Sequence, residues 1–440
     1  MKVTWFRRPT VLLLVLGCFV VTGVAADEYH FINTFIGDRA AGMGGAYTAI
    51  ADGPEGMYYN PAGLAFAPAN YVSVSTNAFE FRNSVYEDLE DTGVDFTRDS
   101  FTLVPNFFGF VQRGTNSVWG FTIFSPDSVS VNLRDTLVFQ RAAAGQIIDQ
   151  QKTIIQDFTY NVSELGPAVG ILLGDKLGVG GALFGGYIQD EQLSRETDRH
   201  TRPDGFFLYQ EQRNTTENSA LFTLRPQIGV QFLPSDTVSV GVSTTARIPI
   251  YREIGRIESY TVGYDDPIFG GAFNPDSVTS YDTTTSDIFN DGLFSSTAIE
   301  NRLGVAWFAS PRLIVSGDVM AYIPLNPSDT PAKKEQQFTW NAALGTEYYV
   351  GQNFPLRFGL FTNNANTRPL KSGETGQPEH VDLYGATASI GFATADITLS
   401  IGGMYSYGIG EGQLIGGNST DIQTLRSQST SVFVSGGYLF

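Results

Sequence analysis

The side chains with reactive chemistry are few, and they stand far apart in the sequence. The three histidines are His30, His200 and His380, and none offers a clear partner for the Ser–His pair that a membrane phospholipase needs. The chain has one cysteine, Cys18, and no His-Glu-x-x-His motif. The glycines of residues 37–66 lack the strand-turn-helix context of a dinucleotide-binding loop. We therefore expect no enzymatic activity, no cofactor and no metal site.

A second set of polar side chains is charged. If the apolar side of each alternating segment faces lipid, four arginines point to the opposite, inner side: Arg225, Arg247, Arg302 and Arg357. Asp318 and Glu347 point the same way. One interpretation is a ladder of salt bridges that stiffens the interior. The other is that one or two of these arginines bind the carboxylate of a ligand, for which the planar guanidinium is suited. The four arginines are thus candidate ligand-binding residues of the lumen.

The scaffold for these side chains begins with an unusual stretch, GDRAAGMGGAYTAIADGPEGMYYNPAGLAF, at residues 37–66. Its seven glycines and its Gly53-Pro54 and Asn60-Pro61 steps exclude a long helix or a regular strand. Its apolar content, which includes Met43 and Tyr47, is too high for a solvated linker. An irregular apolar segment of this length is either functional or buried inside something. We predict that residues 27–69 form a plug, or hatch, packed inside a barrel.

The rest of the chain alternates apolar and polar side chains with the period of a β-strand. Fourteen such segments are expected, at 70–81, 101–112, 117–125, 157–173, 176–189, 219–232, 236–250, 297–309, 312–323, 336–350, 354–364, 381–393, 396–407 and 430–440. Short turns alternate with long loops, which is typical of an outer-membrane barrel. The alternatives are a soluble β-sandwich or a propeller. The predicted fold is all-β: a fourteen-stranded antiparallel transmembrane β-barrel over residues 70–440, with the N-terminal hatch in its lumen.

Both ends of the chain carry signals of export. Residues 1–26 read as a signal peptide, with a basic start, an apolar centre and small residues before Asp27; a membrane anchor or a lipoprotein leader ending at Cys18 are the alternatives. The last strand alternates apolar residues up to a terminal Phe440, which resembles the signal read by the barrel-insertion machinery. With 27 basic and 45 acidic residues the formal net charge is −18, which disfavours nucleic acid as a partner.

Two of the long loops have a character of their own. Residues 251–296 are acidic and rich in Asp, Ser, Thr and Gly. A solvated loop is one interpretation; calcium binding, or contact with lipopolysaccharide through divalent cations, is the other. Residues 126–156 differ, because Arg141–Ile155 lacks proline and is expected to form a short amphipathic helix at the barrel mouth.

The hatch sequence resembles the N-terminal hatch of the FadL/TodX family of outer-membrane transporters for hydrophobic compounds. The resemblance is strongest at Gly42–Ala46, Ala49–Asp52 and Asn60-Pro61-Ala62-Gly63, and segments 343–349, 355–359 and 382–407 are similar to late strands of that family. It implies a fourteen-stranded barrel plugged by a hatch. It also implies that a ligand captured at the extracellular loops passes an apolar lumenal pocket and leaves sideways, beside a kinked strand. Asn60, Pro61, Ala62 and Gly63 match the hatch motif at that lateral gate.

The expected function is therefore passive uptake of hydrophobic small molecules, such as fatty acids or aromatic hydrocarbons, across the bacterial outer membrane. Its partners would be that ligand, outer-membrane lipid and lipopolysaccharide. The alternative is a barrel similar to the PorV type, which serves protein secretion or binds a protein partner, because the motif Gly-Met-Gly-Gly-Ala…Asn-Pro-Ala-Gly-Leu occurs there too.

One residue of the motif carries a specific structural prediction. The asparagine of an Asn-Pro step is held near an extended conformation, and its amide can bind open backbone groups. We predict that Asn60 caps the backbone of a kinked wall strand, among the first three strands, where Pro105 interrupts a ladder. The alternative is that Asn60-Pro61 only forms a turn within the hatch.

Overall fold

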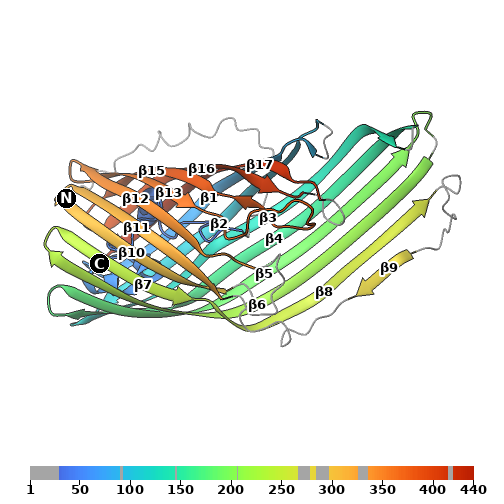
Figure 1. The fold of residues 1–440 in the computed structure, drawn as a ribbon. Coiled ribbons are helices and arrows are strands. Elements are labelled where there is room, and N and C mark those ends of the chain that lie inside the picture. Colours follow the sequence, from blue (N-terminus) through green and yellow to red (C-terminus); the bar gives the residue numbers. More distant parts are fainter. Residues whose placement is uncertain are drawn as a thin grey trace, which may run out of the picture.

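The computed structural model describes residues 29–89, 93–143, 146–205, 207–265, 278–283, 297–325, 335–414 and 420–440. These residues form a closed antiparallel β-barrel with an N-terminal segment inside it (Figure 1). The predicted signal peptide lies outside the described residues. No helix among the described residues is long and apolar enough to span a membrane.

The strands begin after the N-terminal segment, and their bounds follow. They are β1 (Tyr71–Tyr86), β2 (Phe96–Arg113), β3 (Ser117–Ala143), β4 (Gln146–Leu173), β5 (Leu177–Thr201), β6 (Phe207–Ser235), β7 (Val238–Ala246), β8 (Ile248–Asp265), β9 (Val278–Thr283), β10 (Thr297–Ser310), β11 (Leu313–Leu325), β12 (Thr339–Val350), β13 (Phe354–Asn363), β14 (His380–Val381), β15 (Leu383–Ala393), β16 (Ile397–Gly412) and β17 (Gln423–Leu439).

The barrel wall of the described chain has fourteen strands, as predicted. Segments β7 and β8 both pair with β6 and form one strand interrupted at Arg247. Segments β14 and β15 both pair with β16, and the short β9 pairs with β8. The first and last strands pair from Tyr71↔Leu439 to Tyr86↔Leu425, which closes the cylinder.

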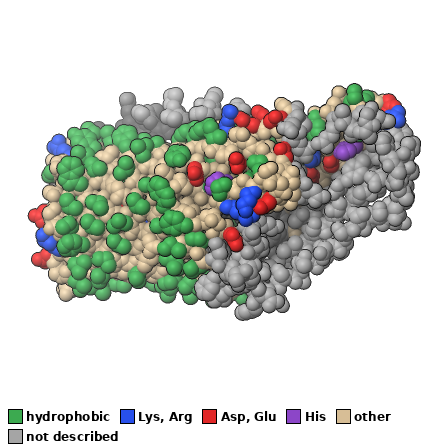
Figure 2. All heavy atoms as spheres, viewed as in Figure 1, with side chains coloured by type: hydrophobic (Ala, Val, Ile, Leu, Met, Phe, Trp, Pro, Cys, Tyr) green, Lys and Arg blue, Asp and Glu red, His purple; other side chains and the backbone are tan. Residues whose placement is uncertain are grey.

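Alternation along each strand creates an apolar outside and a polar inside. In β12 the side chains of Trp340 and Leu344 are exposed, whereas Asn341 and Glu347 are buried. Apolar side chains cover the outside of the barrel as a broad belt (Figure 2). A closed wall lets such a belt face lipid because every strand has a partner on both sides. The short turns and the C-terminal Phe440 lie at one end of the barrel, where Phe440 N donates to Asn70 O (3.0 Å).

Four strands are much longer than a bilayer requires. Strands β3, β4, β5 and β6 have 27, 28, 25 and 29 residues, whereas β13 has 10. A strand needs only about 9–11 residues to cross a membrane. The excess continues beyond the barrel as an extended sheet (Figure 1). We call this sheet the wing; it comprises residues 127–143 of β3, 146–163 of β4, 187–201 of β5, 207–221 of β6 and 250–265 of β8.

The predicted helix over Arg141–Ile155 is wrong. Residues 141–143 end β3 and residues 146–155 belong to β4, which pairs with β3 on one side and β5 on the other. The isoleucines of this segment are β-branched, which favours a strand. Partners on both sides outweigh the helical preference that the absence of proline allows. The predicted loop over residues 251–296 is wrong in part, because residues 251–265 belong to β8 and residues 278–283 form β9. Residues 266–277 and 284–296 lie outside the described residues, so the calcium and lipopolysaccharide interpretation stays a prediction.

The wing leaves the barrel at two interrupted ladders. Between β2 and β3 the pairing joins Phe107–Arg113 to Val118–Phe124, and no described residue of 96–106 pairs with β3. We call this interruption the β2–β3 seam. On the other side, β10 pairs with β7 up to Ile299↔Ala246 and not with the described part of β8. Pro105 and Pro126 stand next to the β2–β3 seam, and proline cannot donate a ladder hydrogen bond.

Candidate functional site

The hatch, of which the structure describes residues 29–69, fills the lumen without forming a long regular element. It contains α1 (Asp38–Gly42), α2 (Gly56–Tyr59) and the 3-10 helix η1 (Pro61–Phe66). Asn60 caps η1, because its Oδ1 accepts from Ala62 N (3.2 Å), and Pro61 occupies the first helical position, where its missing N–H costs nothing. Nearly all hatch side chains from Phe35 to Ala67 are buried.

Polar side chains of the wall hold the hatch backbone. A buried backbone group without a partner is costly, and the irregular hatch cannot satisfy all of its own groups. Six wall side chains donate hydrogen bonds to backbone carbonyl oxygens of the hatch. These bonds run from Asn106 to Phe35 O (2.9 Å), from Gln227 to Tyr58 O (2.9 Å), from Gln231 to Ala49 O (3.0 Å), from Ser243 to Tyr59 O (2.7 Å), from Asn363 to Ile32 O (2.6 Å) and from Thr387 to Gly42 O (3.0 Å). Asp318 accepts from Tyr47 N (3.0 Å) and Thr48 N (2.9 Å). These inward polar residues therefore fix the hatch in place.

Glycines of the wall allow the hatch backbone to approach this closely. A Cβ at Gly180 would lie 2.4 Å from Ala62 N, and one at Gly359 would lie 2.2 Å from Gly44 N. A Cβ at Gly229 would lie 2.0 Å from Asn60 Oδ1. A Cβ atom essentially never lies within 3.0 Å of another non-bonded heavy atom, so a side chain at any of these three positions would force the hatch to shift. The inner wall is thus shaped as a mould for the hatch.

The sequence motif Asn60-Pro61-Ala62-Gly63 lies against β4, β5 and β6. Asn60 Nδ2 donates to Thr48 O within the hatch (3.0 Å) and to Val230 O of β6 (3.2 Å). The side chain therefore binds the wall as well as the hatch, so it does more than form a turn. The wall contact is made with β6 and not with the first three strands, which was the wrong part of the prediction. The role of these four residues at a lateral gate stays a prediction.

Three of the four candidate arginines meet in one upper cluster with two glutamates. Arg225 and Arg247 both contact Glu164, at 3.3 and 2.7 Å. Arg225 also lies 3.8 Å from Glu300, which pairs with Arg302. These five side chains carry one more positive than negative charge. Arg247 is the most accessible of the three arginines, with 36% of its side chain exposed.

The upper cluster packs against aromatic side chains of both the hatch and the wall, namely Tyr58 of α2, Phe124 of β3 and Phe184 of β5. The guanidinium carbon of Arg225 lies 4.6 Å from the Tyr58 ring centre, and that of Arg302 lies 5.4 Å from it. The Phe124 ring packs against Tyr58 on one side and against Phe184 on the other, with 5.1 Å between ring centres in both pairs. Cations over ring faces are stabilised by the ring quadrupole. The region therefore combines apolar surface with a positive charge, which suits a molecule that has both an apolar body and an anionic head.

The fourth candidate, Arg357, belongs to a separate lower cluster that ties the hatch to the wall. Its Nε lies 2.6 Å from Glu347, which also binds Arg39 of the hatch in a bidentate pair at 3.0 Å. Arg39 Nη1 lies 2.7 Å from Asp52, and Arg357 lies 3.6 Å from Asp38. The structure thus does not bring Arg357 together with the other three arginines.

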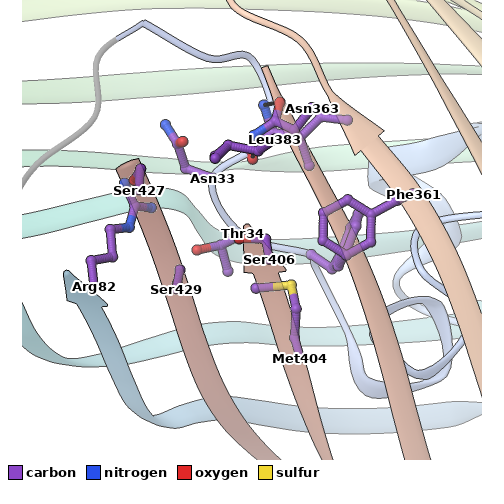
Figure 3. A pocket seen from close by; sticks show the side chains of 12 residues that line it. Asn33, Thr34, Arg82, Phe361, Asn363, Leu383, Met404, Ser406, Ser427 and Ser429 are labelled. Carbon is purple, nitrogen blue, oxygen red and sulfur yellow. Dashed lines mark hydrogen bonds between the residues drawn. The ribbon is translucent and has the colours of Figure 1, made fainter. Parts of the chain in front are cut away.

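The first residues of the hatch lie in the lumen beside a small cavity. The Phe31 ring stacks on Tyr322 with 4.1 Å between centres, and Phe35 meets Phe361 edge-on at 4.9 Å. Figure 3 shows Asn33 and Thr34 facing side chains of β13, β15, β16 and β17 across the cavity. Its volume of about 20 Å³ suffices for roughly one water molecule. A larger ligand needs this segment to move.

The same segment spans the β2–β3 seam. Asn106, next to the last ladder pair on β2, donates to Phe35 O at 2.9 Å. Asn33 Nδ2 donates to Asp127 Oδ2 on β3 at 2.8 Å. Outside the seam, Phe101 is 45% exposed and stacks on Phe79. Sequence reasoning missed Asn33, Asn106 and Asp127, because the seam is defined by which residues of β2 and β3 pair, and the sequence does not show this pairing. The only local signal of an interrupted ladder was the two prolines, Pro105 and Pro126.

The barrel mouth at the long-loop end is covered by an apolar cluster. Buried side chains from three hairpin regions, β1–β2, β13–β15 and β16–β17, meet side chains of the wing there. The cluster comprises Tyr86, Leu89, Phe96, Leu137, Ile154, Val381, Leu383, Leu414 and Leu425. Within the described residues, this cluster and the hatch therefore obstruct the lumen at two levels.

The three histidines have structural partners. His30 Nε2 donates to Val381 O (2.7 Å), His200 pairs with Asp198 (3.0 Å), and His380 Nδ1 lies 3.2 Å from Thr367 Oγ1. Among the described residues, no group of three or more His, Cys, Asp or Glu side chains is arranged to hold a metal ion.

Several solved structures superpose on more than 90% of this chain. A FadL homologue of Pseudomonas aeruginosa superposes with a TM-score of 0.59 at 12% identity, covering 93% of this chain and 100% of that one. The toluene transporter TodX of P. putida gives 0.58 at 13%, covering 91% and 97%. The toluene transporter TbuX of Ralstonia pickettii gives 0.51 at 10%, covering 91% and 97%. No protein-family model and no curated protein matches the sequence.

At these identities the likeness establishes the fold, which is that of FadL- and TodX-type barrels. An even-stranded antiparallel barrel with short turns at one end, long connections at the other and an outward apolar belt is the architecture of outer-membrane proteins. The chain is therefore a bacterial outer-membrane barrel.

Proposed function

We propose that this outer-membrane barrel takes up hydrophobic small molecules by passive transport. The observation that carries the proposal is a lumen closed by a tightly fitted hatch in a fold shared with solved hydrophobic-compound channels. A general diffusion pore needs an open aqueous path, whereas a hydrophobic ligand needs apolar surface and protection from water. Tyr58 of the hatch packs with Phe124 of β3 and Phe184 of β5 in a buried aromatic group beside Arg225, which is an apolar lining for the lumen next to the upper cluster.

Within this function, the upper cluster favours ligands with a carboxylate, such as fatty acids, over neutral hydrocarbons. Three guanidinium groups face two glutamates, so one positive charge is left for an anionic head. Arg247, the most accessible of the three, is the residue that we assign to it. A planar guanidinium binds carboxylates through paired hydrogen bonds.

We further propose that the ligand leaves sideways through the β2–β3 seam. Below the upper cluster, the hatch is fixed to the wall by hydrogen bonds and ion pairs, so a downward route would require many of them to break. At the seam, no described residue of 96–106 in β2 pairs with β3. The outward-facing Phe101 of this stretch offers apolar contact to lipid. Asn60, Pro61, Ala62 and Gly63 are expected at the lateral gate, but they lie against β4, β5 and β6, so we propose that they act on the seam indirectly by seating the hatch.

Uptake is tested in a strain that lacks this gene, with labelled oleate and labelled toluene as probes. We expect the wild-type protein to restore oleate uptake. Arg247→Gln should lower oleate uptake about tenfold, equivalent to one charge-assisted hydrogen bond of roughly 1.4 kcal/mol, and leave toluene entry unchanged. Normal growth of the deletion strain on every hydrophobic carbon source would count against uptake. An equal loss for both probes would count against the carboxylate assignment alone.

The lateral exit has its own test. Replacing Pro105 and Pro126 by valine restores two backbone donors beside the seam, which favours extension of the β2–β3 ladder. We expect oleate uptake to fall in the double variant while oleate still binds the purified protein. Pro167→Val in β4, which faces outward and lies away from the seam, is the matched control. Unchanged uptake in the double variant would exclude the seam as the exit.

A further inference from the structure

We propose that Glu55 is a proton-operated latch of the hatch: its neutral form completes a hydrogen-bonded chain from the hatch to the wall, and its ionised form breaks that chain. This inference concerns the hatch itself and does not depend on which compound the barrel transports. It rests on the arrangement of Glu55, Tyr47 and Asp52, which the ion pairs of the lower cluster extend to the wall.

The first observation behind the latch is that the single hydroxyl proton of Tyr47 is shared between two carboxyl groups. Tyr47 Oη lies 2.9 Å from Glu55 Oε1 and 3.4 Å from Asp52 Oδ1. A tyrosine hydroxyl can donate only one hydrogen bond, although it can also accept. When Glu55 is ionised, Tyr47 can serve only one of the two carboxylates. When Glu55 is protonated, it donates to Tyr47, and Tyr47 is free to donate to Asp52.

The chain then continues to the barrel wall. Asp52 binds Arg39 at 2.7 Å, and Arg39 binds Glu347 of β12 in a bidentate pair. Glu347 in turn binds Arg357 of β13. Protonation of Glu55 thus joins the segment before α2 to two wall strands through a continuous series of hydrogen bonds. Coupled hydrogen bonds of this kind strengthen one another in a low dielectric.

The charge balance around Glu55 works in the same direction. The lower cluster and Glu55 together hold four carboxyl groups, Asp38, Asp52, Glu55 and Glu347, against two guanidinium groups, Arg39 and Arg357. Glu55 is only 4% exposed, so an ionised form would add a buried negative charge to a cluster already in deficit of cations. Burial and the neighbouring Asp38 raise the pKa of Glu55 to about 7.

The groups that face Glu55 come from each element packed against it. They are Asp38 and Arg39 of α1, Tyr47 and Asp52 of the hatch turns, Tyr59 of α2 and Tyr71 of β1. Of the charged groups, only Arg39 favours the ionised form. Glu55 directly precedes α2, and Gly56 O of α2 accepts a hydrogen bond from Asn60 N (2.8 Å). A displacement of Glu55 therefore also displaces the Asn60-Pro61 turn. A pH rise through neutrality should therefore loosen the turn that binds β6.

Hydrogen exchange of the purified barrel between pH 5.5 and 8.5, corrected for the intrinsic pH dependence, tests the latch. We expect the amide protection of residues 56–63 to fall about tenfold as pH rises through 7. Glu55→Gln keeps the shape and stays neutral, so its protection should remain high at all pH values. Tyr47→Phe removes the link, so its protection should be low at all pH values. Wall peptides from β12 serve as the internal control.

The outcomes separate the latch from a merely structural glutamate. A pH profile of Glu55→Gln that matches the wild-type profile would overturn the proposal. So would a wild-type hatch whose protection does not change with pH. Because exchange is measured without a transported compound, neither result depends on whether the barrel takes up oleate.

Discussion

At single positions of the wall, a missing side chain decides how closely the hatch can lie. Gly180 of β5 faces Ala62, and any Cβ there would meet backbone atoms that have no room to move. Its neighbour Gly181 faces the other way, and a Cβ there would meet Gln227 O at an ordinary 3.7 Å. The two adjacent glycines thus make a matched pair.

We expect Gly180→Ala to destabilise the folded barrel by about 1–3 kcal/mol, the usual cost of overpacking. Gly181→Ala should be neutral to slightly stabilising, since alanine loses less conformational entropy than glycine in a strand and its Cβ makes only an ordinary van der Waals contact. Thermal unfolding in detergent, followed by gel mobility, measures both. Equal midpoints for the two variants would show that the hatch does not press on this wall.

Glu55 also predicts how the stability of the protein depends on pH. Its carboxyl group holds a proton up to about pH 7 in the folded protein, whereas the unfolded chain releases it near 4.5. The folded state therefore binds the proton more tightly, and the free energy of unfolding falls as pH rises between these values. The contribution is on the order of 3 kcal/mol. Denaturation in detergent from pH 4.5 to 8 should show this slope, and Glu55→Gln should flatten it.

Residue-level prediction from sequence succeeded where one strand's alternation was sufficient. It placed Arg225, Arg302 and Arg357 on the inner side, where the structure finds them. It could not pair them, because Arg225 meets Glu164 and Glu300 through strand neighbours that are far apart in the sequence. The same limit hid Asn106 and Asp127, whose partners belong to the hatch.

At the scale of elements, the wing is the main departure from the predicted barrel. Its β3–β4 hairpin contributes Leu137 and Ile154 to the apolar cluster over the mouth, whereas no described residue of β5 or β6 joins that cluster. Strand positions within the membrane were predicted well, since alternation is strict there. Strand lengths were not, because polar wing strands look like loops until their neighbours are known.

The two wing hairpins allow a controlled experiment. We expect removal of residues 133–156, which shortens the β3–β4 hairpin at the pair Asn132↔Asp157, to uncover the mouth cluster and reduce oleate capture several-fold. Removal of residues 195–214 at the pair Ser194↔Thr215 of β5–β6 should have a smaller effect. Uptake at limiting oleate measures both. The reverse order would show that the mouth cluster does not take part in capture.

At the scale of the whole molecule, the described residues obstruct the lumen at the mouth cluster and at the hatch. We expect planar-bilayer recordings to lack the steady open level of a porin, because ions would have to pass both obstructions. Shortening the β3–β4 hairpin should not change this, since the hatch remains. A steady conductance in the wild-type protein would contradict a closed lumen.

The mould-like fit of the wall around the hatch also constrains the order in which the protein is assembled. Gly180 and Gly359 touch hatch backbone from different strands, so a completed cylinder leaves no clearance through which an irregular chain could be threaded. The hatch directly precedes β1, and β1 closes the barrel against β17, which is synthesised after all the other described strands. We therefore expect the wall to close around a hatch already in place. In pulse-labelled cells, heat-resistant gel mobility and protection of the hatch from protease should then arise together.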